Sequence, residues 1–301
     1  MIVTVSAAAV NQSAVQSIKQ PSQTAKDAIA ANIAALAEQL QQGHSEALTA
    51  YLTAMGRFRE YSFGNIIEIA RQRPTATRVA GFHTWKQFGR NVKKGERGIR
   101  IFAPIIGARR RVEEDAESDR RPRKESQVVG FRAVYVFDVS QTEGKELPEL
   151  AERVTGSVGE YRDRLFTFIA GQNIEIEFND TIAPALGASY GGRIALLPGQ
   201  AAPEEFLTLV HELAHEMLHR TSRRTETTKT VRELEAESIA FVVAQAIGLN
   251  TGHSSANYIR LYNGDAALLA ERLEVIQQTS AAILSALEMP AKSNQTELSY
   301  S

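Results

Sequence analysis

The chain has 301 residues, of which 43% are hydrophobic and 23% charged, with a formal net charge of −1 and no cysteine. This composition excludes a fibrous or low-complexity protein, and the lack of cysteine excludes disulfides, thiolate catalysis and cysteine-based zinc sites. The sequence has neither an apolar run long enough to span a bilayer nor a basic leader with an apolar segment at its N-terminus. We therefore expect a cytoplasmic protein without a membrane partner.

Positive charge is concentrated in the first half of the chain. Residues 1–146 carry a net charge of +7, whereas residues 147–301 carry −8. Nine of the ten charged residues in the window 71–100 are basic. Such a window is either a solvated face or a binding surface for a polyanion.

The first half is predicted to be an α+β domain that spans residues 22–146, after a flexible segment 1–21. Apolar residues at helical spacing predict a pair of helices over residues 25–58, with Gly43 and Gly56 as stops. The charged insert 107–127 is predicted to be an exposed extension of a hairpin. The predicted strands are Thr77–Ala80, Ile99–Pro104 and Val128–Val139.

The second half, residues 147–290, is predicted to be mainly helical with a small sheet, followed by a flexible tail 291–301, so that the whole chain is α+β. Pro203, Gly248 and Asp265 stand where helix ends favour such residues. The predicted helices are Glu149–Ala170, Pro203–Arg220, Thr230–Ile247 and Asp265–Met289, and the predicted strands are Ile174–Phe178 and Gly192–Leu197.

The most informative motif is His211-Glu212-Leu213-Ala214-His215, an HExxH sequence within a stretch of helical periodicity. Two histidines four residues apart lie one helical turn apart on one face, so both rings can reach one Zn²⁺, with Glu212 beside the open coordination position. Chance would give this motif in about one of a hundred sequences of this composition. The alternative is a pair of surface histidines on an amphipathic helix.

A site with two histidines needs a third protein ligand. His219 continues the same row, but eight helical residues separate it from His211 by about 12 Å, which is too far for both to bind one ion. We therefore expect His219 at the rim of the site. The third ligand must come from another element.

The next helix supplies three carboxylates, those of Glu233, Glu235 and Glu237. Glu233 and Glu237 share a face, whereas Glu235 points elsewhere. We predict Glu233 as the ligand and Glu237 as the carboxylate that fixes the tautomer of a ligating histidine. Alternatively, Glu233 completes a capping box with Thr230.

These residues predict a zinc metallopeptidase. Three protein ligands leave one position open for water, and Glu212 would take a proton from this water as it attacks a peptide carbonyl. A His₂Glu site prefers Zn²⁺ and also accepts Mn²⁺ or Co²⁺. The strand at residues 192–197 either pairs with an extended peptide at its edge or is only structural. Candidate donors to the oxyanion, each of which could equally be a packing or surface residue, are Tyr258, His253 and His219.

Several segments resemble the ArdC antirestriction proteins. YSFGNIIEIA, GFHTWKQFGRNVKKGERGIRIFAP and VVGFRAVYVFDVSQTEG resemble their N-terminal single-stranded-DNA-binding domain, which is also found in plasmid primases of the TraC type. HELAHEMLH, RELEAESIAFVVAQAIGL and ANYIRLY resemble their metallopeptidase half, so the resemblance covers about residues 22–290. In related zincins with an E-x-x-A-[DE] second helix, which are gluzincin-like, the first acid is the ligand, and it corresponds to Glu233. The charged insert 107–127 departs from the family pattern.

The resemblance implies that the first domain coats single-stranded DNA during conjugation and protects incoming plasmid DNA from host restriction. Such binding needs aromatic rings against bases and cations along phosphates, with little sequence preference. Trp85 is the chain's one tryptophan and could instead be a core residue. The candidates for DNA contact are Phe82, His83, Trp85, Lys86, Arg90, Lys93, Lys94 and Arg97.

Two other functions remain open at this stage. One is a cytoplasmic zinc metalloprotease whose N-terminal domain recruits a protein substrate, for which a restriction component is one candidate. The other is a DNA-binding protein with a vestigial zinc site.

Overall fold

The computed structural model describes residues 21–42, 45–110, 124–147, 158–220, 222–249 and 265–288. Helices and strands both occur, which confirms the α+β class. The chain divides into two compact units, and the described part of the smaller one holds the start of the first helix and the outer parts of two paired strands, residues 102–110 and 124–133. Of the segments expected to be mobile, 1–21 and 291–301, all residues except Pro21, which begins the first helix, lie outside the described residues.

The N-terminal half contains the predicted helix pair and all three predicted strands, and also short elements that were not predicted, namely α3, α4, β2 and β5. Its elements are α1 (Pro21–Gln41), α2 (Ser45–Arg57), α3 (Phe63–Gln72), β1 (Val79–Gly81), α4 (Phe82–Gln87), β2 (Arg90–Val92), β3 (Ile99–Arg110), β4 (Lys124–Asp138), the 3-10 turn η1 (Val139–Gln141) and β5 (Thr142–Gly144).

The charged insert is shorter than predicted. Strand β3 continues to Arg110 and β4 begins at Lys124, so both ends of the segment 107–127 are strand, and only residues 111–123 lie outside the described part.

The sheet has the order β1-β4-β3, and β2 pairs with β5 in a separate antiparallel ribbon.

The C-terminal half contains the predicted helices and strands. The expected helix from residue 149 begins, within the described residues, at Gly159. The short elements β7 and α7 were not predicted. The elements are α5 (Gly159–Gly171), β6 (Glu175–Phe178), the 3-10 turn η2 (Asp180–Ile182), β7 (Gly187–Ser189), β8 (Arg193–Leu196), α6 (Ala202–Leu218), α7 (Arg223–Glu226), α8 (Lys229–Ala246) and α9 (Ala266–Glu288).

Strand β8 lies in the middle of its sheet. The order is β6-β8-β7, with β6 parallel and β7 antiparallel to β8. Of the two alternatives for the strand at residues 192–197, the structure therefore supports the purely structural one, because both of its edges are paired. Within the described residues, the edge strand on that side is β7.

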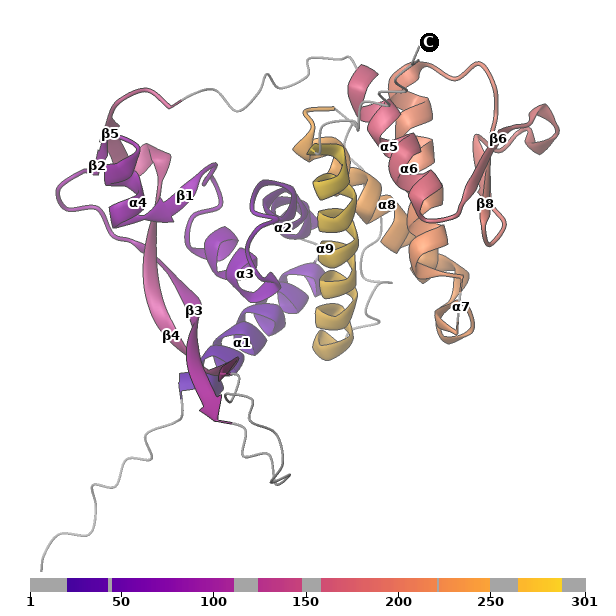
Figure 1. Cartoon of the computed structure of the whole chain (residues 1–301). Coiled ribbons are helices and arrows are strands. Elements are labelled where there is room, and N and C mark those ends of the chain that lie inside the picture. The colour runs from indigo at the N-terminus through magenta and orange to yellow at the C-terminus, as the bar shows by residue number, and fades with distance from the viewer. Residues whose placement is uncertain are drawn as a thin grey trace, which may run out of the picture. The chain divides into compact units, whose positions relative to one another are not determined.

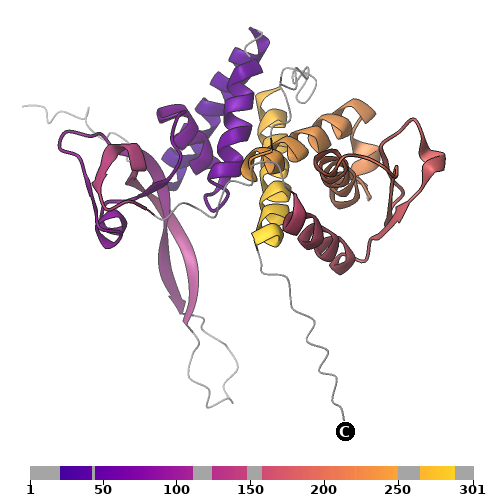
Figure 2. The ribbon, with the colours of Figure 1, turned by 90° about the horizontal axis from the view of Figure 1, so that it is seen from above.

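The helices of both halves pack around one hydrophobic core. Helix α6 packs on α8, α8 packs on α2 and α9, and α9 also contacts α5 (Figures 1 and 2). Leu52 of α2, Leu213 of α6 and Val242 of α8 are fully buried in this core. The predicted boundary between residues 146 and 147 therefore does not separate two hydrophobic cores. The domain bounds themselves remain a prediction. None of the described helices is both long and apolar enough to cross a membrane.

Gly56 is a packing residue rather than the predicted helix stop. Helix α2 continues through it to Arg57. A Cβ atom at Gly56 would lie 3.0 Å from the backbone oxygen of Val242 and 3.2 Å from Cβ of Ala246. The glycine therefore permits the close approach of α2 to α8.

Candidate metal centre

Helix α6 carries the HExxH motif. Pro203 lies in its first turn, where the N–H that proline lacks would have no partner within the helix. The carboxylates of Glu204 and Glu205 stabilise the same end of α6 by interacting with the positive end of the helix dipole. The apolar positions, such as Leu209 and Leu213, are fully buried. This burial fixes the rotation of α6, so that the two histidines face α8.

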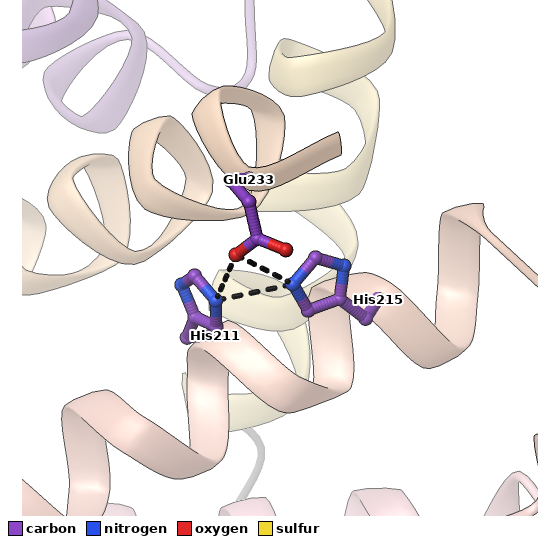
Figure 3. A group of neighbouring side chains, drawn as sticks. All are labelled: His211, His215 and Glu233. Atoms are coloured by element: carbon purple, nitrogen blue, oxygen red, sulfur yellow. Dashed lines mark hydrogen bonds and ion pairs between the residues drawn. The ribbon is translucent and has the colours of Figure 1, made fainter. Parts of the chain in front are cut away.

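The three predicted ligands converge. Nε2 of His211 lies 3.1 Å from Nε2 of His215, and Oε2 of Glu233 lies 3.5 Å from each of these nitrogens (Figure 3). Ligands bound at about 2.1 Å from one ion are separated by about 3–4 Å, so these spacings fit a single cation. Among the described residues, this is the group of histidines and carboxylates whose ligand atoms lie close enough together to hold a metal.

Glu233 is free to reach the histidines because it does not cap its helix. The cap of α8 is Thr228, whose hydroxyl oxygen accepts a hydrogen bond from the backbone N–H of Val231 at 3.3 Å. The N-cap therefore lies two residues before Thr230, and the alternative capping box of Thr230 and Glu233 does not form.

The charges of the site suit a cation. The hydrogen bond with His211 lowers the pKa of Glu233 to about 2, so this carboxylate is ionised. Burial and the neighbouring His211 lower the pKa of His215 to about 4, which leaves that ring neutral at neutral pH. Burial also lowers the pKa of His211, but the hydrogen bond with Glu233 and the nearby carboxylates outweigh it, so the net shift is upward. A cation would displace the proton that His211 shares with Glu233.

Glu212 lies beneath the edge strand β7. A Cβ atom on Gly187 would lie 2.8 Å from Cγ of Glu212 and 3.0 Å from its Oε1, so only glycine lets the strand pass this close. Burial raises the pKa of the Glu212 carboxyl, the direction that favours a general base. This arrangement places a proton acceptor directly beside the backbone of β7.

The turn between β7 and β8 is fixed by α6. Gly191 and Gly192 have φ values of 78° and 112°, the left-handed conformation that suits glycine in a two-residue hairpin. Their N–H groups donate to the buried carboxylate of Glu216 at 2.7 and 2.6 Å. Because Glu216 lies one residue after His215, the same helix positions both the metal ligands and the strand above them.

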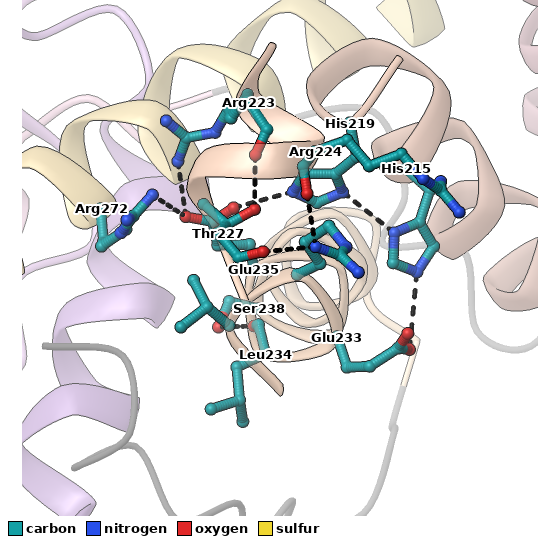
Figure 4. Close-up of polar contacts among 12 residues, drawn as sticks. His215, His219, Arg223, Arg224, Thr227, Glu233, Leu234, Glu235, Ser238 and Arg272 are labelled. Carbon is teal, nitrogen blue, oxygen red and sulfur yellow. Dashed lines mark hydrogen bonds and ion pairs between the residues drawn. The ribbon is translucent and has the colours of Figure 1, made fainter. Parts of the chain in front are cut away.

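His219 is buried, not at the rim as we predicted. Its side chain is 1% exposed; its Nδ1 lies 3.0 Å from Nδ1 of His215, and its Nε2 lies 2.9 Å from Oε2 of Glu235 (Figure 4). The other oxygen of Glu235 accepts hydrogen bonds from Arg223 at 2.6 Å and Arg272 at 3.1 Å. Burial raises the pKa of Glu235, but the hydrogen bond from His219 and the two guanidiniums outweigh it, so the net shift is downward.

This buried chain sets the tautomer of His215. An ionised carboxylate only accepts hydrogen bonds, so Nε2 of His219 must carry the proton toward Glu235. With neutral rings, Nδ1 of His219 is then an acceptor and Nδ1 of His215 is the donor. The lone pair of His215 is left on Nε2, the atom that faces Glu233 and His211. Spacing alone missed this role because it placed His219 at the rim of the site or near the oxyanion, and not in the core behind His215.

Glu237 does not hold a ligating histidine as predicted. It is exposed, it lines a cavity beside His211, and its charge acts on His211 only at a distance. The task predicted for Glu237 is carried out, for His215, by His219 and Glu235. The remaining oxyanion candidates, His253 and Tyr258, lie outside the described residues.

The predicted DNA-contact residues differ in their burial and in their hydrogen bonds. Trp85 is 2% exposed and its Nε1 donates to the backbone oxygen of Phe137 at 2.8 Å, so it is a core residue and is removed from the set. The guanidinium of Arg90 and the ammonium of Lys93 donate to backbone oxygens in and next to β5. The exposed members that remain are Phe82, His83, Lys86, Lys94 and Arg97.

An exposed aromatic face lies beside these residues. The ammonium of Lys86 lies 5.1 Å from the ring centroid of Phe82, which in turn lies 6.5 Å from the ring of Phe137. Tyr135 is two residues away from Phe137 on β4, on the same face of the strand, and is 60% exposed. Gly98 passes over both side chains with no Cβ to cover them. The alternation along β4 was the signal that could have predicted Tyr135.

The comparisons with known proteins cover different shares of the chain, and the family match lies in its N-terminal half. Residues 19–137 match the family described as the N-terminal domain of anti-restriction factor ArdC. A protein of Bacillus anthracis described as uncharacterized is 23% identical over an alignment that covers 81% of this chain and 48% of that protein, so this chain spans about half of its length.

Two crystal structures of the antirestriction protein ArdC from plasmid R388, described as metal-free and Mn(II)-bound, are each 20% identical to this chain, with TM-scores of 0.48 and 0.46. The alignments cover 75% and 76% of this chain and 85% of theirs. Residues 19–137 of this chain therefore resemble the N-terminal domain of ArdC antirestriction proteins.

Proposed function

We propose that this protein is an antirestriction factor that binds single-stranded DNA through its N-terminal half and carries a metallopeptidase centre on α6 and α8. The observation that carries the peptidase proposal is the convergence of His211, His215 and Glu233 within 4.8 Å of one another. Glu212 lies next to them in sequence and beneath β7. Two imidazoles and one carboxylate are the ligands of hydrolytic zinc sites.

The donor set fits a divalent cation. The neutral ring of His215 and the ionised carboxylate of Glu233 already present lone pairs toward one point, and the ligand set favours Zn²⁺, with Mn²⁺ or Co²⁺ as alternatives. When bound there, the ion supplies Lewis acidity, which polarises a peptide carbonyl and acidifies water.

The other residues of the centre bind the substrate and move protons. The edge of β7 that is unpaired among the described residues binds an extended peptide through backbone hydrogen bonds, the role considered for β8. Glu212 accepts a proton from the attacking water and passes it to the leaving nitrogen. His219 and Glu235 keep His215 in the tautomer that presents Nε2.

The metal and the hydrolysis are tested separately. Purified protein dialysed against Zn²⁺ should retain one ion per chain, measured by elemental analysis, and Glu212→Gln should retain the ion equally well. A mixed peptide library should be cleaved by the zinc-loaded protein and not by Glu212→Gln. Absence of a stoichiometric ion would contradict the metal centre, and absence of cleavage with the ion bound would contradict the peptidase.

A second set of observations favours DNA binding. Lys94 and Arg97 are exposed, and within the described part of the chain neither side chain has a hydrogen-bond or ion-pair partner. Phe82 is 42% exposed and lies beside Lys86, and the exposed Tyr135 lies on β4. Free cations next to exposed rings match the two requirements of single-strand binding, phosphate neutralisation and base stacking.

Salt dependence tests this binding. We expect the affinity for a labelled oligothymidylate to fall linearly with the logarithm of salt concentration, and a duplex of equal length to bind less tightly. Equal affinity for duplex and single strand would contradict a stacking mode.

The antirestriction role and the two alternatives are separated in cells. Glu212→Gln should be compared with the unaltered protein for protection of an incoming plasmid from restriction. Loss of protection in this variant, with zinc still bound, supports a catalytic role. Full protection by Glu212→Gln would favour the DNA-binding protein with a vestigial site. Protection by a variant that has lost its affinity for DNA would favour the plain protease.

A further inference from the structure

Two cavities of opposite chemistry meet at Glu212. One has a volume of about 480 Å³ and the other about 750 Å³, and both are lined by Gly187, His211 and Glu212. We call the smaller one the apolar pocket, with Leu186, Leu207 and Phe241 in its wall, and the larger one the basic pocket, with Arg224, Lys229 and Arg232 in its wall. A chain that crosses Glu212 must therefore pass from one pocket to the other.

The basic pocket carries more positive than negative charge, with three basic side chains in its wall against the carboxylates of Glu212 and Glu233. The side chain of Arg232 is held in place, because its guanidinium donates hydrogen bonds to the backbone oxygens of Arg224 and Thr227. The side chains of Arg224 and Lys229 are exposed and have no hydrogen-bond or ion-pair partner in the described part of the chain. Lys229 also stands in the first turn of α8, so the positive end of the helix dipole adds to its charge.

The apolar pocket would repel an acidic side chain. Its carboxylates are Glu212 and the exposed Glu237, and its wall, as far as the structure describes it, contains no lysine or arginine. Apolar side chains such as Leu207 line the rest of it. The two pockets therefore discriminate between the two sides of a bound molecule by both charge and polarity.

The edge of β7 favours a peptide over other anionic molecules. Leu186 and Tyr190 are hydrogen-bonded to β8, by Leu197 N–H to Leu186 O and Tyr190 N–H to Arg193 O, each at 2.9 Å. Antiparallel pairing alternates, so the backbone groups of Gly187 and Ser189 point to the free edge. Gly187 lies where the pockets meet, and Ser189 lines the basic pocket, so a strand paired here would run through both.

We propose that the centre acts on an extended peptide in which an apolar residue, held in the apolar pocket, is next to a residue that carries a carboxylate, held in the basic pocket. This rests on the proposed peptidase function. The C–N bond between the two residues lies at Glu212; its hydrolysis adds the OH of water to the carbonyl carbon and the proton to the leaving nitrogen. The carboxylate is either an acidic side chain or the peptide's own C-terminus.

Binding to the zinc-loaded Glu212→Gln protein tests the proposal without turnover. The probes are fluorescent hexapeptides, amidated and acetylated, that contain Leu-Asp or Asp-Leu in an alanine background. Replacing Asp by Lys should weaken binding about tenfold, and replacing Leu by Gly should weaken it by about tenfold or more. An alanine peptide with a free C-terminal carboxylate, compared with its amide, distinguishes the two sources of the carboxylate.

Charge reversal assigns the preference to the basic pocket. In Arg224→Glu/Lys229→Glu, the Lys-containing peptide should bind more tightly than the Asp-containing one. The matched control is Lys94→Glu/Arg97→Glu, which reverses two exposed charges that do not line either pocket and should leave the preference unchanged. Retention of one zinc per chain shows that each variant is folded.

The outcomes separate this inference from the proposed function. Peptide binding without a preference for the acidic residue, or a preference that survives the reversal at residues 224 and 229, overturns the inference and leaves the peptidase intact. Failure of every peptide to bind overturns both. Displacement of bound peptide by an oligonucleotide in the Lys94→Glu/Arg97→Glu background would show that the basic pocket holds phosphates instead.

Discussion

The candidate metal centre on α6 and α8 and the segment 82–97, here called the α4–β2 region, hold their candidate side chains in opposite ways. In the centre, Glu235 is 0% exposed and each of its oxygens has a partner, so a chain of contacts leads from Arg272 through Glu235 and His219 to His215. In the α4–β2 region, Lys94 and Arg97 extend into solvent. The first arrangement fixes geometry, which metal binding requires, whereas the second leaves side chains free to follow an irregular polymer.

The largest effect should come from a lost metal ligand. Glu233→Gln removes the charged donor, and we expect the zinc affinity to fall by about a thousandfold or more, since only two neutral imidazoles remain. Glu237→Gln is the matched control on the same helix and should bind zinc normally, because Glu237 makes no hydrogen bond to a ligating histidine in the described structure. Equal losses in both variants would contradict the assignment.

The next effect should come from the buried chain behind His215. His219→Leu cannot accept the proton on Nδ1 of His215, so we expect zinc affinity to fall about 10- to 100-fold. His219→Gln offers an acceptor to His215 and a donor to Glu235, and should restore much of the affinity. ¹⁵N NMR of the histidine rings reports the tautomer directly, and a His215 ring that keeps its proton on Nδ1 in His219→Leu would contradict the role.

Replacing aromatic residues of the α4–β2 region and of β4 should distinguish the residues that bind DNA from those that only stabilise the fold. Phe82→Ala and Tyr135→Ala should each weaken binding of a single-stranded oligonucleotide by about tenfold, since one stacked base contributes about 1–3 kcal/mol. Trp85→Phe should lower thermal stability and leave the affinity nearly unchanged, because Trp85 is buried. A large affinity loss confined to Trp85→Phe would reverse this assignment.

The smallest effect should come from the free cations. Replacing Lys94 and Arg97 by Ala should reduce the slope of log affinity against log salt by about 1.4, if both contact phosphates of a single strand. A titration between low and moderate salt measures this change. An unchanged slope would mean that these two residues lie away from the bound strand.

The convergence of His211, His215 and Glu233 could be predicted from sequence because helical periodicity fixes their positions. Two histidines four residues apart must share a face, and Glu233 is placed by the same rule on the next helix. What spacing could not provide was burial: Glu235 was set aside because it points away from the ligands, yet it points into the core toward His219. Buried polar chains of this kind depend on which helices meet, and no local pattern encodes that.

In the α4–β2 region, the sequence did not separate the buried residues from the exposed ones. The helix α4 has six residues, too few for periodicity to separate a buried Trp85 from an exposed Phe82. Strand β7 was missed for a similar reason, since its three residues, Gly187–Ser189, are small and follow a loop. Both depend on tertiary pairing, with Phe137 for Trp85 and with β8 for β7.

Anomalous X-ray scattering at the zinc edge, from crystals of the zinc-loaded protein, tests the central assignment most directly. We expect one peak about 2.1 Å from Nε2 of His211, Nε2 of His215 and a carboxylate oxygen of Glu233. A peak bound elsewhere, or Glu233 turned away from an ion held by the two histidines, would contradict it.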